Sequence, residues 1–233
     1  MPDVTAVVFD LYGTLLDVTS LVERCERIVP HVSARDLVEL WRRKQLEYTW
    51  LRSVMGRYAD FWAVTTEALE HAAGRLGARL DAPAQSRLME GWLLLEPYPE
   101  VRMALDRLDR LVPSIPLAVL SNGSPQMLEQ VLEHTRLRSR FRHVLSVDEV
   151  RIYKPSPRVY ALAERHLGLA RSSILFVSAN GWDVAGAGAF GFSVAWVNRS
   201  GVPAEALPGA PALVVDDLEA LADALEQQRS SPG

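Results

Sequence analysis

Short apolar runs separated by amphipathic stretches set the pattern of hydrophobic and polar positions along this chain. The first run, residues 4–9, is almost continuously apolar, as expected of a strand buried on both faces of a parallel sheet. Similar runs follow at residues 115–120, 173–177 and 193–197, with a weaker one at 213–215. Apolar spacings of three and four predict helices between them, for example at 126–132, 158–167 and 218–225. This alternation predicts an α/β fold with a doubly wound, Rossmann-like parallel sheet.

The segment between the first two apolar runs follows a different pattern. It contains no convincing strand, and its periodicity predicts only helices, at residues 21–28, 34–51, 58–76 and 83–95. We therefore expect an α/β core domain of residues 1–15 and 98–233, with a helical cap domain of residues 16–97 inserted after the first strand.

Polar residues follow the predicted strands of the core. They form clusters at residues 10–14, 121–124 and 178–183, and a fourth cluster at 153–155 precedes a predicted helix. Ligands of open parallel sheets bind beyond the carboxyl ends of the strands. The four clusters are therefore expected to meet on one rim of the sheet and to form a site there.

Each cluster taken alone also has an ordinary structural explanation. Asp10 can start an Asx-turn in which Gly13 supplies the bend, and Ser124 can cap the helix that follows it. Lys154 can be a solvated lysine ahead of Pro155, which starts a helix. The joint occurrence of all four clusters at strand ends favours a functional site.

Composition and charge exclude several classes of protein. The 233 residues, 48% of them hydrophobic, suit one globular domain or one core with an insert. A formal net charge of -4 lacks the basic excess of a nucleic-acid binder. The single cysteine, Cys25, cannot form an internal disulfide, and we interpret it as structural. Without a signal peptide or an apolar stretch of membrane-spanning length, the expected location is the cytoplasm, with no membrane partner.

Four segments resemble motifs of the haloacid dehalogenase superfamily, and within it the L-2-haloacid dehalogenase branch. Three of them are residues 9–15 (FDLYGTL), 120–125 (LSNGSP) and 178–183 (SANGWD). The fourth is residues 153–155 (YKP), and residues 40–52 (LWRRKQLEYTWLR) also resemble the arginine-bearing cap helix of that branch. The resemblance covers nearly the whole chain and implies the hydrolysis of small (S)-2-haloacids to 2-hydroxy acids and halide, through an ester on Asp10.

The resemblance also implies roles for individual residues. The catalytic group implied around the nucleophile Asp10 is Thr14, Arg42, Ser121, Lys154, Tyr160, Ser178, Asn180 and Asp183. In this group Lys154 balances the carboxylate charge, Arg42 engages the substrate and the departing halide, and Asp183 helps to activate the second-step water. Substrate or halide binding is implied for Leu11, Tyr12, Arg42, Leu46, Phe61, Ser121, Asn122 and Trp182. The other cap tryptophans, Trp41, Trp50 and Trp62, are spaced like residues of a helix core.

Tyr12 argues against the phosphatase chemistry that dominates the superfamily. A phosphatase of this type carries a general-acid aspartate at this position, and a phenol with an ordinary pKa of about 10 is a poor acid at neutral pH. Magnesium prefers several hard oxygen ligands, and the last motif offers only Ser178, Asn180 and Asp183. We therefore expect no metal and no other cofactor.

Three other functions stay open. The chain could be a related carbon-centred hydrolase, for instance one that opens the ring of a small cyclic imino acid by the same Asp10 attack. It could also be a magnesium-dependent phosphatase, or a non-catalytic protein of this fold. The expected partners are a haloacid, water, halide and a second copy of the chain, because the cap helices carry many large apolar residues.

Overall fold

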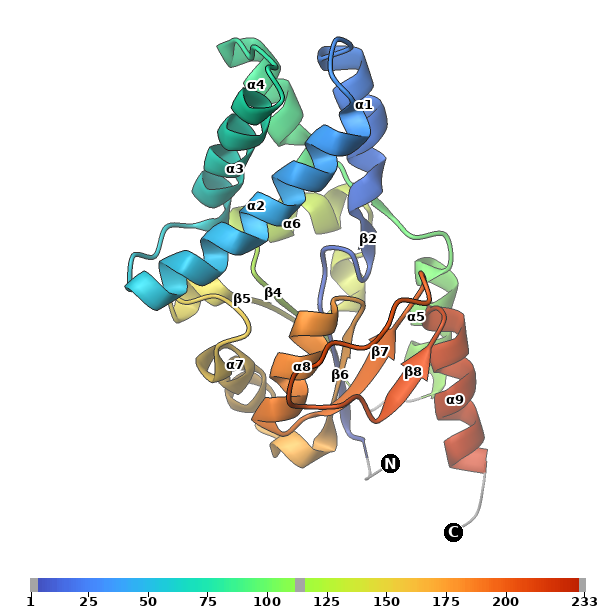
Figure 1. Cartoon of the computed structure of the whole chain (residues 1–233). Coiled ribbons are helices and arrows are strands. Elements are labelled where there is room, and N and C mark those ends of the chain that lie inside the picture. The colour runs from blue at the N-terminus through green and yellow to red at the C-terminus, as the bar shows by residue number, and fades with distance from the viewer. Residues whose placement is uncertain (1–3, 112–115, 231–233) are drawn as a thin grey trace.

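A six-stranded parallel sheet forms the centre of the computed structural model, which describes residues 4–111 and 116–230 (Figure 1). The spatial order is β5-β4-β1-β6-β7-β8. In that order the strands are His143–Ser146, Leu117–Ser121, Ala6–Phe9, Ile174–Ser178, Ser193–Val197 and Leu213–Val215. All five neighbouring pairs are parallel. The predicted α/β fold with a doubly wound parallel sheet is confirmed. Residue 115, the start of the second predicted strand, lies outside the described residues.

The first strand in the chain, β1, lies in the middle of this sheet. Phe9 at its end is in register with Val119 of β4 on one side and with Val177 of β6 on the other. The carboxyl ends of β4, β1 and β6 are therefore neighbours. The strand order changes direction at β1, which is the position where open α/β sheets bind ligands.

Five helices accompany the sheet. They are α5 (Val101–Leu111), α6 (Pro125–His134), α7 (Pro157–Leu167), α8 (Gly181–Phe190) and α9 (Leu218–Ser230). α7 packs against α8, and α5 packs against α9. Within residues 4–111 and 116–230, no helix has the length and apolar character needed to cross a membrane.

Four further helices gather at one end of the molecule, beyond the sheet (Figure 1). They are α1 (Leu21–Ile28), α2 (Ala34–Met55), α3 (Phe61–Arg75) and α4 (Ala82–Glu90). The long helix α2 packs against α1 and α3, and α4 packs against α1. The predicted insert is therefore helical along most of its length.

Two short strands pair where the chain enters and leaves these helices. β2 (Leu16–Asp17) is antiparallel to β3 (Glu96–Pro97), with Leu16 in register with Pro97. The expectation of no strand in this segment is wrong, because two-residue strands are too short to show a period of two. Their pairing depends on contact between distant parts of the chain. The division into a core and a cap domain stays a prediction.

Caps explain where the predicted boundaries of α2 and α3 differ from the observed ones. α2 continues to Met55 because nothing interrupts it before Gly56, which has a φ of 64° and ends the helix in the left-handed conformation. α3 begins at Phe61, because the Asp60 side chain accepts a hydrogen bond from the Ala63 N–H at 2.8 Å.

The predicted helix over residues 83–95 is shorter in the structure. The α-helix ends at Glu90, and Gly91–Leu93 continues as a 3-10 turn. A Cβ atom on Gly91 would lie 2.6 Å from Cδ2 of Leu21. Glycine at this position therefore allows α1 to approach closely.

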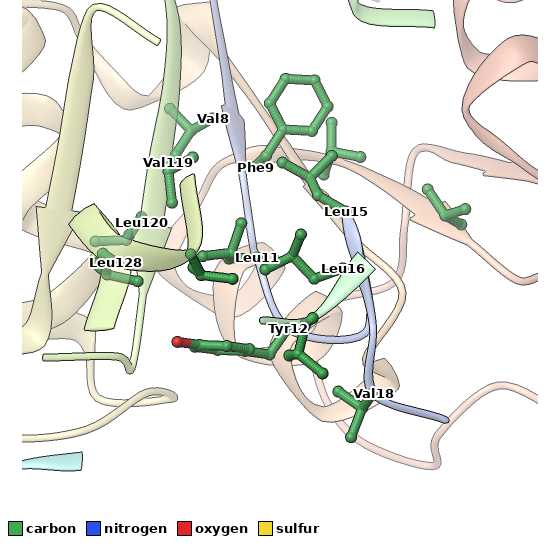
Figure 2. Close-up of a cluster of buried hydrophobic side chains, with 14 of the residues drawn as sticks. Val8, Phe9, Leu11, Tyr12, Leu15, Leu16, Val18, Val119, Leu120 and Leu128 are labelled. Carbon is green, nitrogen blue, oxygen red and sulfur yellow. The ribbon is translucent and has the colours of Figure 1, made fainter. Parts of the chain in front are cut away.

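Apolar side chains around the end of β1 form the centre of the core (Figure 2). Val8 and Phe9 of β1 and Leu11, Leu15 and Leu16 of the following loop are all fully buried. This packing fixes the backbone on both sides of residue 10, so the polar side chain there projects from a rigid segment.

The single cysteine is part of the same buried cluster. Cys25 of α1 is unpaired and fully buried, and burial raises the pKa of its thiol to about 11. A neutral thiol in apolar surroundings agrees with a structural role.

Candidate active site

Asp10 follows β1 directly and is held by the turn that comes after it. Its N–H donates to the Val177 carbonyl at 2.9 Å, which continues the pairing with β6. The Leu11 carbonyl accepts from the Thr14 N–H, and Gly13 has a φ of 85° that closes the turn. This turn brings Thr14 Oγ1 to within 2.9 Å of Asp10 Oδ2, to which it donates.

Two other segments contact the Asp10 carboxylate. Asn180 Nδ2, at the start of α8, donates to Oδ2 at 2.8 Å, and Lys154 Nζ donates to Oδ1 at 3.0 Å. Among the described residues, Oδ2 therefore accepts two hydrogen bonds and Oδ1 accepts one. Asp10 is only 5% exposed, so these contacts replace most of its hydration.

Lys154 lies between two carboxylates. Its ammonium is 3.0 Å from Asp10 Oδ1 and 2.8 Å from Asp183 Oδ2, and the Lys154 and Asp183 side chains are fully buried. Burial by itself lowers the pKa of Lys154, but the charges of Asp10 and Asp183 outweigh it and leave the pKa above its ordinary value. Lys154 is therefore a permanent cation within this cluster.

Asp183 has a carboxyl pKa raised above its ordinary value. Burial raises its pKa, Lys154 lowers it and Asp10 raises it further, with a net value of about 6. The Tyr160 hydroxyl donates to Asp183 Oδ1 at 2.7 Å and also lowers this pKa. Burial holds the pKa of Tyr160 well above its ordinary value, so Tyr160 remains a donor.

The polar residues at the ends of β4 and β6 hydrogen-bond to the neighbouring backbone. Ser121 Oγ accepts from the Gly123 N–H at 3.2 Å, and Ser178 Oγ accepts from the Asn180 N–H at 3.1 Å. Asn122 Oδ1 accepts from the Lys154 N–H at 3.1 Å. All three side chains lie on the predicted rim, but among the described contacts none of them donates to Asp10. They order the loops that carry the site.

Arg42 comes to the site from α2. Its Nη1 donates to Gln45 Oε1 at 2.6 Å, and its Nη2 lies 3.4 Å from the carbonyl oxygen of Tyr12, two residues after Asp10. Burial lowers the pKa of Arg42, and the nearby Asp10 charge raises it. In the described part of the chain Arg42 has no salt bridge to a carboxylate. The guanidinium is therefore available to an anion.

Aromatic rings line the apolar side of the loop after β1. The ring of Tyr12 lies 5.8 Å from Phe61 and 5.6 Å from Trp92, centroid to centroid. Figure 2 shows Tyr12 beside Leu11 and the other apolar side chains of this region. Burial raises the pKa of Tyr12, and its hydroxyl has no hydrogen-bond partner among the described residues. The Tyr12 side chain therefore contributes its ring to the apolar packing around this loop.

Two predicted binding residues, Trp182 and Leu46, line separate pockets. Trp182 is half-buried and makes an edge contact with Trp50, and both line a pocket of about 560 Å³ that reaches Lys154. Leu46 lines a pocket of about 730 Å³ that reaches Arg42. The structure thus connects Trp182 and Leu46 to the site through these two cations.

The cap tryptophans only partly behave as core residues. Trp41 is fully buried, as the spacing predicts. Trp62 is half-buried and packs against the buried core, which agrees with the core interpretation. Trp50 is half-buried, lines a pocket with Trp182 and is not among the described residues of that core, so the core interpretation is wrong for Trp50. Helical spacing shows which residues share a face, and it does not show whether a neighbouring element covers that face.

Four residues close to the site have no part in the sequence-based prediction: Gln45, Thr65, Trp92 and Arg199. Gln45 and Thr65 lead to Arg42, Trp92 packs against Tyr12, and Arg199 binds the backbone after Asp10. The sequence could have identified Gln45. It follows Trp41 by one helical turn, so a polar residue stands where the helical pattern expects an apolar one.

Comparison with known proteins shows which family the chain resembles. A family model described as haloacid dehalogenase-like hydrolase matches residues 4–191. The chain is similar to the (S)-2-haloacid dehalogenase of Pseudomonas sp. (strain YL), with 48% identity over 97% of this chain and 96% of that protein. It is also similar to haloacetate dehalogenase H-2 of Moraxella sp. (strain B), with 43% identity over 95% of this chain and 97% of that protein.

A solved structure shows the same similarity in three dimensions. It is the L-2-haloacid dehalogenase from Xanthobacter autotrophicus with chloropropionic acid covalently bound. The TM-score is 0.88 at 40% identity, and the match covers 98% of this chain and all of that one.

Proposed function

The chain belongs to the haloacid dehalogenase-like hydrolase family, and we propose that it is an (S)-2-haloacid dehalogenase that converts small 2-haloalkanoic acids to 2-hydroxy acids and halide. The observation that carries this proposal is the buried Asp10 carboxylate, which is paired with the permanent cation Lys154 and lies near the Arg42 guanidinium. Within the described residues Arg42 makes no salt bridge to a carboxylate. A carboxylate nucleophile and an anion site are the two groups that displacement of halide from a 2-haloacid requires.

In the first step Asp10 attacks carbon 2 of the substrate. A carboxylate oxygen can accept two hydrogen bonds, so Thr14 and Asn180 saturate Oδ2, while Oδ1 keeps one position free beside Lys154. Oδ1 therefore forms the bond to carbon, the carbon–halogen bond breaks, and the halide leaves with its electron pair. Correct alignment of the two reactants accounts for roughly 7–11 kcal/mol of the barrier.

Arg42 binds the charges of the substrate. Its guanidinium lies next to the loop after Asp10 and binds the substrate anion and the negative charge that develops on the halogen. Asn122 and Trp182 complete the halide site. Tyr12 and Phe61 form the apolar wall that excludes water from carbon 2. No acid is needed to protonate a departing halide, which agrees with a tyrosine at position 12.

In the second step water hydrolyses the ester on Asp10. Ser178 and Asn180 hold the water in place. The water attacks the carbonyl carbon of Asp10, and Asp183 accepts a proton from the water. A general base works best with a pKa near the working pH, and burial has moved the pKa of Asp183 to about 6. The bond between the Asp10 carbonyl carbon and the ester oxygen then breaks, and the departing alkoxide takes the remaining proton of the attacking water to leave as the 2-hydroxy acid. Asp10 is left as a carboxylate, and Asp183 releases its proton to solvent. The attack inverts carbon 2 only once, so (S)-2-chloropropanoate gives (R)-2-hydroxypropanoate.

A phosphatase activity has less support. The hydroxyl of Tyr12 is buried among aromatic rings, and burial raises its pKa, so it is an even weaker acid than a free phenol. Asp10 and Asp183 share the Lys154 ammonium, which already neutralises one of their two negative charges.

Halide release is the direct test of this function. We expect the purified enzyme to release chloride from (S)-2-chloropropanoate and chloroacetate at the same rate with and without EDTA. No halide release from any small haloacid would contradict the proposal. Phosphate release from phosphate esters that depends on magnesium would favour a phosphatase, and hydrolysis of a small cyclic imino acid would favour the other carbon-centred hydrolase.

A single turnover in heavy-oxygen water tests the role of Asp10. With enzyme in excess, the label should enter the Asp10 carboxylate, while the first hydroxy acid formed stays unlabelled. Label in the first product would mean that water attacks carbon 2 directly. Asp10→Asn should remove turnover, because an amide is a poor nucleophile.

We also propose a homodimer in the cytoplasm. Three apolar residues at the end of α2 are exposed to solvent: Leu51 (47%), Val54 (87%) and Met55 (62%). An apolar patch of this kind supports an interaction surface. The cytoplasmic location stays a prediction.

A further inference from the structure

A chain of buried polar groups connects Arg42 to helix α3. Arg42 Nη1 donates to Gln45 Oε1 at 2.6 Å, and Gln45 Nε2 donates to Thr65 Oγ1 at 2.7 Å. The Thr65 hydroxyl in turn donates to the Phe61 carbonyl at 2.5 Å. Gln45, Thr65 and Phe61 are all fully buried. We call the three fully buried residues, Phe61, Thr65 and Gln45, the anchoring chain. Arg42, to which this chain leads, is only partly buried.

The donors and acceptors of the anchoring chain run in one direction. A backbone carbonyl only accepts, so the single hydroxyl proton of Thr65 is used on Phe61. Thr65 Oγ1 must then accept from Gln45, which turns the amide NH₂ of Gln45 toward α3. The amide oxygen consequently faces the other way, toward Arg42.

This direction matters because a guanidinium can only donate. If the Gln45 amide were reversed, its NH₂ would face the Arg42 guanidinium, and two donors would meet in a buried site. Such a contact leaves both groups unsatisfied. The Thr65 hydroxyl therefore determines whether Gln45 attracts or repels Arg42.

Thr65 is itself held firmly. Its carbonyl accepts a hydrogen bond from Trp41 Nε1 at 2.8 Å, and Trp41 is fully buried between α2 and α3. The anchoring chain is thus fixed to both helices. With Nη1 held by Gln45, Nη2 of Arg42 lies at the Tyr12 carbonyl, on the loop that follows Asp10.

We propose that Gln45 and Thr65 are positioning residues that aim the Arg42 guanidinium at the haloacid anion and the departing halide. This inference rests on the proposed dehalogenase function. The side-chain hydrogen bonds of both residues run to Arg42, to each other and to the Phe61 carbonyl, so we assign neither a contact with the substrate. They act only through the orientation of the guanidinium.

The test compares Thr65→Val with two matched variants. Valine has the shape of threonine without the hydroxyl, and Thr65→Ser restores the hydroxyl. Thr66→Val is the control, because Thr66 is the next residue of α3 and donates to the Trp62 carbonyl at 2.9 Å in the same way, without contact to Gln45. Gln45→Met removes the hydrogen bond to Thr65 from the other side and also the one to Arg42, because methionine has a similar length and no amide.

We expect Thr65→Val and Gln45→Met to raise the KM for (S)-2-chloropropanoate about tenfold and to lower kcat as well, since a hydrogen bond to a charged group is lost. Thr65→Ser should stay within about threefold of the parent enzyme, and Thr66→Val should be unchanged. A loss of folded enzyme alone lowers kcat at constant KM, so the KM change separates positioning from a structural effect. A KM that stays unchanged in both Thr65→Val and Gln45→Met would overturn the proposal.

A crystal structure of Thr65→Val keeps the inference separate from the proposed activity. If the parent enzyme releases no halide, the dehalogenase function fails, but the orientation of Arg42 can still be compared. Displacement of the guanidinium from Gln45 Oε1 in Thr65→Val, and not in Thr66→Val, supports the anchoring chain. An unchanged Arg42–Gln45 contact in Thr65→Val overturns it.

Discussion

Asp183 is the side chain whose protonation should control the pH dependence of turnover. Its pKa is raised to about 6, so it takes up a proton as the pH falls below that value and can no longer accept one from water. We expect kcat to fall on the acidic side with an apparent pKa near 6, which belongs to the coupled cluster of Asp183, Lys154 and Asp10. The measurement is kcat for halide release between about pH 4.5 and pH 9.

Tyr160→Phe should move this acidic limb to higher pH. The Tyr160 hydroxyl donates to the Asp183 carboxylate and stabilises its charged form, so its removal favours protonation and raises the pKa by about one unit. Tyr153→Phe is the control, because the Tyr153 hydroxyl is bonded to the Ala59 carbonyl and not to Asp183. An acidic limb that does not move in Tyr160→Phe would show that another group limits kcat.

The sequence was most informative about single side chains at the ends of strands. Asp10 and Asp183 could be proposed because each lies in a short polar motif just after an apolar run. Arg199 could not, because its bond to the Thr14 carbonyl joins residues 185 positions apart. For Ser121 the sequence predicted the position and not the contact. Its place on the rim follows from the strand, but the hydrogen-bond partner of its hydroxyl depends on the shape of the loop.

Arg199 fixes the loop between β1 and β2. Its Nη2 donates to the Thr14 carbonyl at 2.9 Å and to Glu100 Oε1 at 2.6 Å, and the guanidinium lies 3.8 Å from the centroid of the Tyr98 ring. Glu100 and Tyr98 lie just after β3. One side chain therefore joins the nucleophile loop to the point where the chain returns from the helical insert.

We predict that Arg199→Met lowers both stability and kcat. The loss of hydrogen bonds that involve charged groups costs about 1.5–3 kcal/mol, which corresponds to a Tm lower by about 3–12 °C for a chain of this size. The loop that carries Asp10 also loosens, so kcat falls. Arg171→Met is the control, because Arg171 makes similar bonds to Glu164 and the Phe190 carbonyl far from this loop. Equal kcat values in the two variants would contradict the role of Arg199 at the loop.

Elements that depend on tertiary packing were the ones that periodicity could not identify. β5 is short and has only two apolar residues, Val144 and Leu145. α8 contains Gly186, at which a Cβ atom would lie 2.5 Å from Pro155 and 2.6 Å from the Tyr160 hydroxyl. Glycine weakens a helix, and here it is needed so that α8 can approach the segment that carries Lys154. Gly186 therefore weakens the helical pattern in the sequence, and the same residue allows α8 to pack close to the site.

The site as a whole is built from both parts of the molecule. The sheet supplies Asp10 at its central strand and Asp183 at the helix after β6, while α2 supplies Arg42. The short β2–β3 ribbon joins these parts close to the nucleophile loop. The predictable rim of the sheet therefore explains the position of the proposed nucleophile, Asp10. The position of the proposed substrate-binding cation, Arg42, depends on the arrangement of the helical insert, which no local pattern determines.

The apolar patch at the end of α2 leads to a prediction about assembly. Val54 lines the same pocket as Trp50 and Trp182, and Leu51 and Met55 are exposed beside it. In a two-fold dimer the same patch contributes from both copies, so one charge added there is introduced twice into an apolar interface. We expect a dimer of twice 25.9 kDa by size exclusion with light scattering, and a monomer for Val54→Glu.

Met103→Glu is the matched control for this experiment. Met103 is 60% exposed on α5, away from α2, so a charge there should leave the dimer intact. A parent protein that is monomeric at all concentrations would contradict the homodimer, and a Val54→Glu dimer would place the interface elsewhere. Because the pocket beside Val54 reaches Lys154, a partner that covers it also restricts the access of water to the buried charge cluster. Val54→Glu should therefore reduce kcat as well as dissociate the dimer, whereas Met103→Glu should change neither.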